Sequence, residues 1–174
     1  IEADPSGLGP DANGNPGPGA LFVLDGTGAL VLVSDGGTCG PTIPACPPGG
    51  AFVDPLGLAY DRATSMLVVA DLDADPSALG RDSHGFAGHG AVYAVDLASG
   101  RVDLVADGSS YAGVIPRGSP SIFEDPLAVT VARDGTLYVV DQLATPLIDQ
   151  AITSPGAVFR VDRASGLVTA VAVI

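Results

Sequence analysis

The sequence predicts an all-β fold made of repeated antiparallel units, and three observations lead to this prediction. Residues 3–25 align without a gap with residues 74–96, an offset of 71 positions (74 − 3), and a looser third copy ends over residues 156–162. Short apolar runs rich in Val, Leu and Ala alternate with turns of Gly, Pro and Asp. No segment has the period and caps of a helix. Repeats of this length are supersecondary units that bury their apolar faces against neighbouring units.

The length and hydropathy of the chain suit one folded domain. The chain has 174 residues, of which 47% are hydrophobic, so residues 1–174 can form a single core. Its longest apolar runs, such as residues 168–174, fall well short of the roughly 20 residues that cross a bilayer as a helix. We therefore expect no membrane span.

The charge of the chain is strongly acidic. There are 20 acidic residues against 7 basic ones, which gives a net charge of −13 at pH 7. Nucleic-acid binding needs clusters of Lys and Arg that neutralise phosphates. We therefore predict no nucleic-acid partner, and we expect the acidic surface to bind divalent cations or to serve solubility.

The second copy of the repeat contains four expected strands in two antiparallel pairs. A long loop over residues 72–89 separates the two pairs. Gly100 occupies the position in the second hairpin turn that needs a positive φ. The expected strands are residues 54–61, 66–71, 91–96 and 101–106.

The third copy has the same order, and the first copy is shorter. In the third copy, Asp134 and Gly135 form a typical hairpin turn, and the expected strands are residues 125–131, 136–141, 157–161 and 167–171. The first copy contains only an outer pair, residues 21–24 and 29–33. The sequence thus predicts ten strands in groups of two, four and four. The aromatic residues on strands are expected in the core or in the packing between blades: Phe22, Tyr60, Tyr93, Tyr138 and Phe159.

Three motifs connect these units to a known family. They are Pro-Leu-Gly-Leu-Ala-Tyr-Asp at 55–61, Leu-Val-Val-Ala-Asp at 67–71 and Gly-Ala-Val-Tyr-Ala-Val-Asp-x-x-Ser-Gly at 90–100. Their order resembles the blade pattern of NHL-type and gluconolactonase-like β-propellers. The resemblance implies four-stranded antiparallel blades whose first strand lines a central channel and whose fourth strand is outermost.

This resemblance divides the chain into about two and a half propeller-like blades. Residues 1–37 correspond to a half blade, and residues 52–108 and 123–174 to one blade each. Closed propellers have 4–8 blades, so we expect an incomplete array that is open or completed by neighbouring chains. The chain is expected to be a processed product or a fragment, and its partners to be other copies of itself, in a ring or a filament.

Cys39 and Cys46 are the only cysteines. They lie in a short loop stiffened by Pro, and no His lies close to them in sequence, which favours a disulfide over a zinc site. A disulfide predicts an extracellular or cell-surface location.

Alternating carboxylates at the start of the long loop suggest a calcium site. Ca²⁺ takes six to eight oxygen ligands from closely spaced acidic and carbonyl groups. The candidate ligands are Asp71, Asp73, Asp75 and Asp82. The alternative is that Asp75 and Asp82 cap turns with their side chains. Asp4 and Asp11 occupy the matching positions of the first copy, which favours the capping role.

The same loop contains both histidines of the chain, His84 and His89. They stand where the first copy has Asn13 and Pro18, so they are not part of the repeated pattern. Together with Asp82 they could bind a transition metal. The alternative is that both are exposed loop residues without a role.

Residues for catalysis are few. There is no Gly-x-Ser-x-Gly nucleophile elbow. The resemblance to gluconolactonase-like enzymes implies a metal held by Glu and Asn in the channel, but the chain offers only Asn13, Asn15, Glu2 and Glu124. The sequence therefore predicts a non-enzymatic secreted structural protein whose blades assemble into a filament, sheath or ring. The alternative is a fragment of a secreted calcium-dependent propeller enzyme of the lactonase kind, or a ligand-binding propeller.

Overall fold

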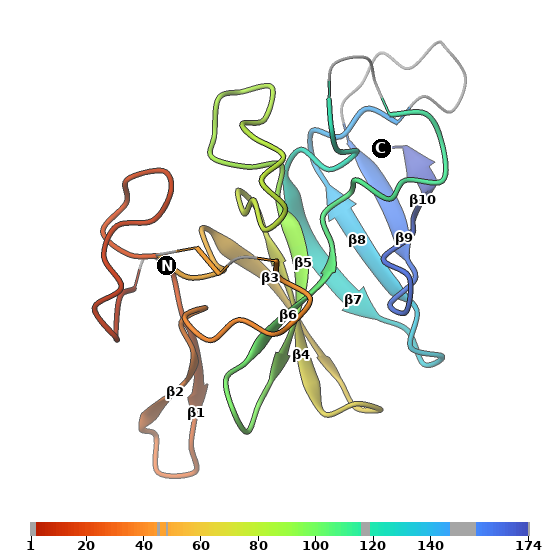
Figure 1. Ribbon diagram of the computed structural model, residues 1–174. Helices are drawn as coiled ribbons and strands as arrows, with labels where there is room; N and C mark the ends of the chain where they lie inside the picture. Colours follow the sequence, from red (N-terminus) through yellow and green to blue (C-terminus); the bar gives the residue numbers. More distant parts are fainter. Residues whose placement is uncertain (1–2, 45, 48, 116–118, 147–155, 174) are drawn as a thin grey trace.

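In the part of the chain that the structure describes, β-strands are the regular secondary structure, and loops and turns connect them (Figure 1). The computed structural model describes residues 3–44, 46–47, 49–115, 119–146 and 156–173. These residues contain ten strands in three antiparallel sheets and no helix, and hence no helix long and apolar enough to span a membrane. The strands are β1 (Leu21–Leu24), β2 (Leu30–Ser34), β3 (Pro55–Asp61), β4 (Met66–Asp71), β5 (Ala91–Asp96), β6 (Val102–Ala106), β7 (Pro126–Val131), β8 (Leu137–Asp141), β9 (Ala157–Val161) and β10 (Val168–Val173).

The predicted groups of two, four and four strands are confirmed. The sheets have the orders β1-β2, β3-β4-β5-β6 and β10-β9-β8-β7, so each strand pairs with its neighbour in sequence. Gly100 and Gly135 have φ values of 72° and 86° in their hairpin turns, as the turn chemistry predicted. The largest boundary error is at β10, which continues two residues past the expected end at 171. A register shift between Ala170 and Ala172 lets its pairing with β9 continue to Val173.

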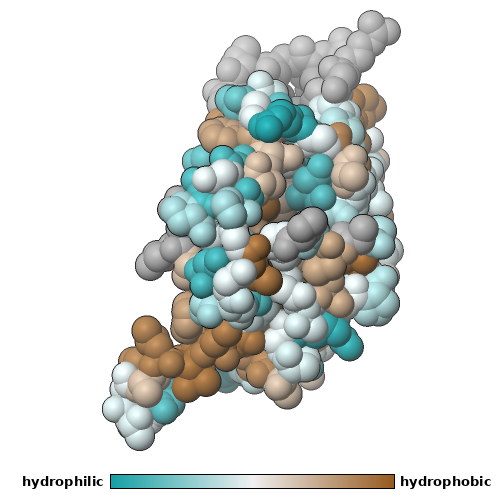
Figure 2. Space-filling model, turned by 60° about the vertical axis from the view of Figure 1, so that its left-hand side comes forward, coloured by the Kyte–Doolittle hydropathy of each residue, from teal (hydrophilic) through white to brown (hydrophobic). Residues whose placement is uncertain are grey.

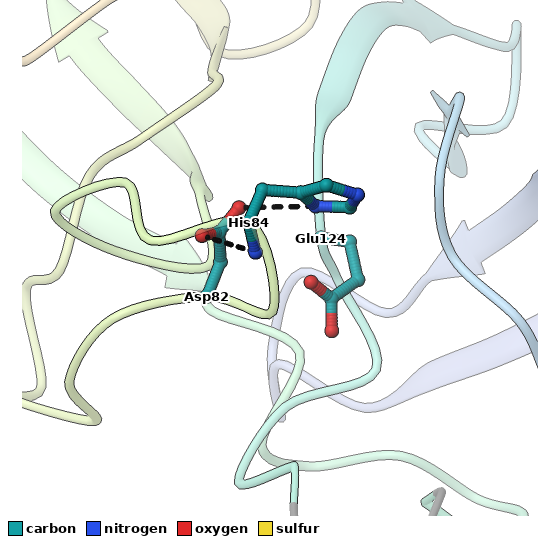
Figure 3. Close-up of side chains that lie close together, drawn as sticks. All are labelled: Asp82, His84 and Glu124. Atoms are coloured by element: carbon teal, nitrogen blue, oxygen red, sulfur yellow. Dashed lines mark hydrogen bonds and ion pairs between the residues drawn. The ribbon is translucent and has the colours of Figure 1, made fainter.

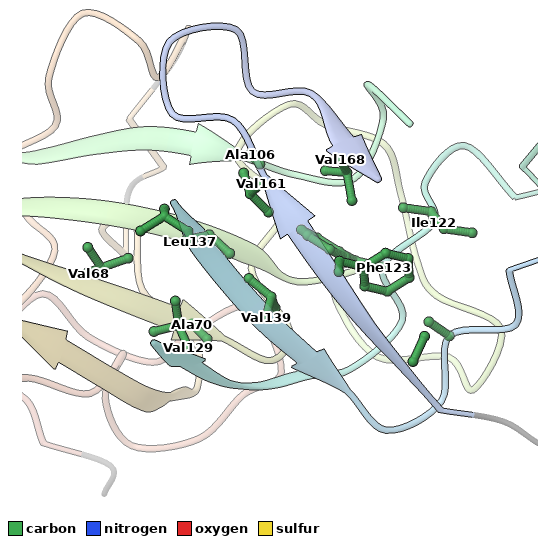
Figure 4. Packing of buried hydrophobic residues seen from close by; sticks show 14 residues of the cluster. Val68, Ala70, Ala106, Ile122, Phe123, Val129, Leu137, Val139, Val161 and Val168 are labelled. Atoms are coloured by element: carbon green, nitrogen blue, oxygen red, sulfur yellow. The ribbon is translucent and has the colours of Figure 1, made fainter. Parts of the chain in front are cut away.

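The two four-stranded sheets bury a common hydrophobic cluster, whose packing Figure 4 shows from close by. It contains Val68 and Ala70 from β4 together with Val139 from β8 and Phe159 from β9, none of which exposes any surface. β4 is apolar from Met66 to Ala70, as is typical of a strand with both faces covered, whereas β9 carries the exposed Arg160 on its outer face.

Two local features hold the sheets together. Gly57 lets β3 approach β7, because a Cβ atom at this position would lie 2.7 Å from Cα of Ala128 and 3.0 Å from the carbonyl oxygen of Leu127. Any side chain at position 57 would therefore push the sheets apart. At the far end of β3, the Arg163 guanidinium from the β9–β10 turn forms an ion pair with the buried Asp61 carboxylate.

A second cluster lies on the opposite face of the β3–β6 sheet. The Phe52 and Tyr93 rings meet edge to face at 5.9 Å, and the Tyr93 hydroxyl donates to the carbonyl oxygen of Ala51 at 2.9 Å. The β1–β2 hairpin reaches this cluster only at its base, through Leu21 and Val33. The rest of the hairpin projects away from the sheets (Figure 1).

The outer edge of each four-stranded sheet is covered by a short segment that precedes the sheet. The backbone at Cys39 lies parallel to Val102 of β6, and that at Tyr111 lies parallel to Val168 of β10. Val102 donates its N–H to the carbonyl oxygen of Thr38 at 2.8 Å. These segments satisfy backbone groups that an open edge strand would expose.

The predicted disulfide is confirmed, and it closes the segment that covers β6. Cys39 and Cys46 are bonded with their Cα atoms 5.6 Å apart and a sequence separation of 7. Within the same loop, the Thr42 hydroxyl accepts the N–H of Leu104 at 2.7 Å. The disulfide thus restrains the loop that carries the edge cover.

Reduction of the disulfide is expected to lower the free energy of unfolding by about 2–3 kcal/mol, because the open loop regains conformational entropy in the unfolded chain. Urea unfolding with and without reductant measures the difference. The Cys39→Ser, Cys46→Ser double variant is the control, since reductant should not change its stability. An equal effect of reductant on the variant would contradict this origin.

Candidate functional site

The long loop between β4 and β5 is built from turns that aspartate side chains cap. Asp75 accepts the N–H of Leu79 at 2.6 Å and that of Gly80 at 3.0 Å. Asp4 makes the equivalent pair of bonds in the first copy, with the N–H groups of residues 8 and 9 at 2.6 Å and 2.9 Å. The capping role expected for Asp75 as an alternative to calcium binding is therefore what the structure shows.

Asp71, at the end of β4, is a buried structural carboxylate. It has no exposed surface and accepts the N–H groups of Val53 and Asp54, both at 2.9 Å. Asp141 ends β8 in the same way, with the N–H of Glu124 at 2.9 Å. Each carboxylate thereby fixes the segment that enters the first strand of its own sheet.

The structure does not gather the four predicted calcium ligands. Asp73 accepts the Asn13 side-chain amide at 2.7 Å, while Asp71 and Asp75 bind backbone N–H groups as described above. Among the described residues, only Asp82 of the four belongs to a group of three or more His, Cys, Asp or Glu side chains close enough to hold a metal ion. The calcium site stays a prediction.

The buried position of Asp71 gives the protein a pH-dependent stability. Burial raises the pKa of its carboxyl to about 7, against the opposing effect of the backbone N–H donors. In the unfolded chain this pKa is about 3.9. Between about pH 4 and about pH 7 the folded protein therefore retains a proton that the unfolded chain has lost, and the free energy of unfolding falls as the pH rises through this window.

We expect urea unfolding to show a higher free energy at about pH 4.5 than at about pH 7. The Asp71→Asn variant cannot ionise at this position, so its free energy of unfolding should change less over the same interval. A wild-type free energy that stays constant or rises from about pH 4.5 to about pH 7 would exclude this linkage.

Asp82, His84 and Glu124 form the group that could bind a metal ion (Figure 3). One ligand atom from each lies within 4.8 Å of the others. Nδ1 of His84 lies 3.6 Å from Oδ2 of Asp82, and the Glu124 carboxylate accepts the hydroxyl of Ser83 at 3.0 Å. Asp82 and His84 come from the β4–β5 loop, and Glu124 comes from the segment before β7.

His89 lies beside this group and differs from His84 in its burial. The expectation of two exposed histidines is correct for His84, which is 46% exposed in its side chain, and wrong for His89, which is 3% exposed. Neither ring nitrogen of His89 has a hydrogen-bond partner, and its Nδ1 lies 3.8 Å from Oε1 of Glu124. Its neighbours explain the burial, because Gly88 and Gly90 let the chain pack closely against other backbone and proline atoms.

These side chains border a cavity of about 350 Å³. Asp82, His89 and Glu124 line it together with a serine-containing stretch, residues 119–122. Imidazole and carboxylate groups at one cavity suit a divalent metal ion.

Sequence reasoning considered Glu124 only as a possible lactonase-like ligand and did not connect it with the histidines. A signal was present in the repeat. The third copy reads Phe-Glu-Asp-Pro at 123–126 where the second reads Phe-Val-Asp-Pro at 52–55. His84, His89 and Glu124 are thus all departures from the repeated pattern.

The β1–β2 hairpin forms a second notable surface, visible as an apolar projection in Figure 2. Phe22 and Tyr60 on β3 were expected in the core or between blades, and both lie outside the core, because the two side chains are 43% and 50% exposed. Beyond Leu21, β1 is exposed on both faces, whereas β3 is exposed on the face that carries Tyr60. Six large apolar side chains of the hairpin are exposed by 40% to 70%: Phe22, Val23, Leu24, Leu30, Val31 and Leu32. We call these six residues the hairpin surface.

No protein-family model matches this sequence, and a comparison with curated proteins finds none similar to it. Fold and site therefore define only a class: an all-β chain of antiparallel sheets with a side-chain group that could bind a metal ion. The expected likeness to NHL-type and gluconolactonase-like propellers stays a prediction.

Proposed function

We propose that this chain is a structural protein that assembles with other copies of itself through the hairpin surface. The single observation that carries the proposal is the exposure of six large apolar side chains on one two-stranded hairpin. Isolated two-stranded hairpins are marginal in water, and contiguous apolar patches of this kind mark interaction sites. In this proposal the chain is not an enzyme.

The other two copies of the repeat show which strand pairing is missing from the β1–β2 hairpin. β5 pairs with β6 on one side and with β4 on the other, and β9 pairs with β10 and with β8. β1 corresponds to β5 in the repeat, yet among the described residues it pairs with β2 alone. Its second edge is therefore suited to accept a strand from a partner by strand addition.

The chemistry of the hairpin surface favours a second copy as that partner. The whole chain carries a net charge of −13, so contacts between most parts of two copies bring like charges together. The strands β1 and β2 contain no charged residue. A neighbouring copy can therefore approach the hairpin at a lower electrostatic cost than it can approach the acidic parts of the surface, and the contact buries the apolar area of the hairpin.

The proposed assembly is head to tail, with propeller-like blades following one another from copy to copy. A contact between two different surfaces repeats into a ring or a filament, whereas a contact of the hairpin with itself ends at a dimer. The disulfide supports a secreted location.

Negative-stain electron microscopy of the purified chain tests the form of the assembly. We expect rings or filaments at micromolar concentration. Particles no larger than a dimer would contradict head-to-tail assembly.

A further inference from the structure

The cavity beside Asp82 has a counterpart one repeat earlier in the chain. A cavity of about 310 Å³ is lined by Pro10, Asp11 and Ala12 and by residues 49–53. The cavity of about 350 Å³ is lined by the matching loop residues 81–83 and by residues 119–122 and 124. A cavity between a long loop and the next repeat thus occurs twice, and the residues that line the two cavities can be compared.

Both cavities contain the same capped turn, but one carboxylate oxygen differs between them. Oδ1 of Asp11 accepts the N–H groups of Asn13 and Asn15 at 2.9 Å and 2.8 Å, and its Oδ2 accepts the Asn15 side-chain amide at 2.8 Å. Oδ1 of Asp82 likewise accepts the N–H groups of His84 and Phe86 at 2.9 Å and 2.7 Å. Since Phe86 replaces Asn15, Oδ2 of Asp82 is buried without a hydrogen bond.

Capping therefore uses only Oδ1 of Asp82, and the buried Oδ2 without a hydrogen bond indicates that a ligand binds there. Buried polar atoms without partners are rare in folded proteins and call for an explanation such as a bound ion. Here two residues at one cavity carry them, because both ring nitrogens of His89 are also unpartnered.

The two linings differ at several positions, among them Arg81 in place of Pro10 and Ser83 in place of Ala12. Three further differences supply metal-binding groups. His84 stands in place of Asn13, His89 in place of Pro18 and Glu124 in place of Val53. The substitutions come from two separate segments of the chain, and the fold brings them to one cavity. Among the described residues, the first cavity has no such set.

We propose that Asp82, His84, His89 and Glu124 bind one divalent transition-metal ion, with Zn²⁺ as its chemical type. Two imidazoles and two carboxylates form a ligand set that Zn²⁺ accepts in tetrahedral geometry. Ca²⁺ prefers an all-oxygen shell with six to eight ligands, which this set does not supply. The inference concerns a site distinct from the hairpin surface and is independent of self-assembly.

The geometry requires a small closure of the loop on binding. Ligand atoms of a tetrahedral zinc site lie about 3.3 Å apart when the bonds are about 2.0–2.1 Å long. The ligand atoms of Asp82, His84 and Glu124 now lie within 4.8 Å of one another, so shifts of up to about 1.5 Å bring these three to zinc-binding distances. His89 is outside this group of three, with its Nδ1 3.8 Å from Oε1 of Glu124, and its ring must move toward the other ligands as the loop closes. His84 is the exposed member and offers the ion a route from solvent, while His89 and Asp82 are buried below it.

Nuclear magnetic resonance of the unaltered protein provides the first test. The chain contains only two histidines, so their ring signals are few and readily assigned. Titration with Zn²⁺ should shift the signals of both imidazoles and reach its end at one equivalent. A shift of His84 alone, or of neither ring, would overturn the proposal.

Variants provide the second test, with calorimetric titration of Zn²⁺ and the visible absorption of bound Co²⁺ as measurements. His89→Ala and Glu124→Gln should each weaken Zn²⁺ binding by about 100-fold or more and change the Co²⁺ absorption that reports a four-coordinate site. Asp134→Asn is the control, because it removes an exposed carboxylate from the β7–β8 turn and should leave binding unchanged.

The thermal midpoint adds a test that does not depend on how well the variants fold. One equivalent of Zn²⁺ should raise the midpoint of the wild-type protein, because the ion binds only the folded state. Three results would each refute the site: no rise in the midpoint, equal weakening by Asp134→Asn, or a calorimetric signal with Ca²⁺ but none with Zn²⁺.

Discussion

Replacing Asp141 with alanine is expected to lower the free energy of unfolding by about 4 kcal/mol. The Asp141 carboxylate is fully buried and accepts four backbone N–H groups, those of Glu124, Asp125, Leu143 and Ala144, at 2.8 Å to 3.1 Å. A buried donor that loses its acceptor costs about 1–3 kcal/mol. For a chain of this length the thermal midpoint should fall by roughly 10 °C.

Asp71, the matching residue of the second copy, provides a comparison for this loss of unfolding free energy. Asp71 accepts two backbone N–H groups from residues 53 and 54, so Asp71→Ala should cost about half as much as Asp141→Ala. Asp134→Ala is the control, since its bond to the N–H of Thr136 is exposed and its loss should cost less than about 1 kcal/mol. Equal losses for Asp141→Ala and Asp134→Ala in urea unfolding would show that the buried carboxylate does not hold the segment before β7.

The second large effect concerns the hairpin surface. Val23 and Val31 are directly opposite each other on β1 and β2, and they are 49% and 46% exposed. The Val23→Arg, Val31→Glu double variant replaces their apolar surface with a cross-strand ion pair, so the hairpin is kept and the net charge is unchanged. Association between copies should weaken by about 100-fold, because each half-exposed valine loses roughly 0.8–1.5 kcal/mol of further burial at the interface and the two new charges must be desolvated there.

A matched double variant carries the same two charges elsewhere. Leu97 in the β5–β6 turn and Val114 after the segment that covers β10 are 41% and 66% exposed. Leu97→Arg, Val114→Glu should assemble as the unaltered chain does in sedimentation velocity. Full assembly of the Val23→Arg, Val31→Glu variant would remove the hairpin surface from the interface.

The strands could be predicted from the sequence because their signals are local. Hairpin turns such as the one at Gly135 require a positive φ, and the apolar runs between turns have the length of single strands. The two copies that align without a gap also fixed which runs are equivalent. The errors at β10 came from a bulge, which leaves no clear mark in sequence.

The candidate metal centre could be predicted only in part, because its members come from distant segments. Asp82 and His84 were recognisable as a local pair in the loop. Glu124 joins them only after the two four-stranded sheets have packed, and the burial of His89 depends on close contacts at Gly88 and Gly90. Neither contact follows from periodicity, but both residues could have been found as departures from the repeat.

Exposure was the least predictable property of the hairpin. The sequence of β1 is apolar at every position, which is typical of a strand buried on both faces. Residue type alone therefore placed Phe22 in a core or between blades. Whether a strand is covered depends on its neighbours in space, and β1 has only β2 beside it among the described residues.

The molar mass of the unaltered chain as its concentration rises tests the central claim most directly. Light scattering should give a mass that grows beyond that of a dimer at micromolar concentration, because the hairpin surface of each copy binds a different surface of the next. A mass of 17.2 kDa, that of one chain, at all concentrations would contradict the claim.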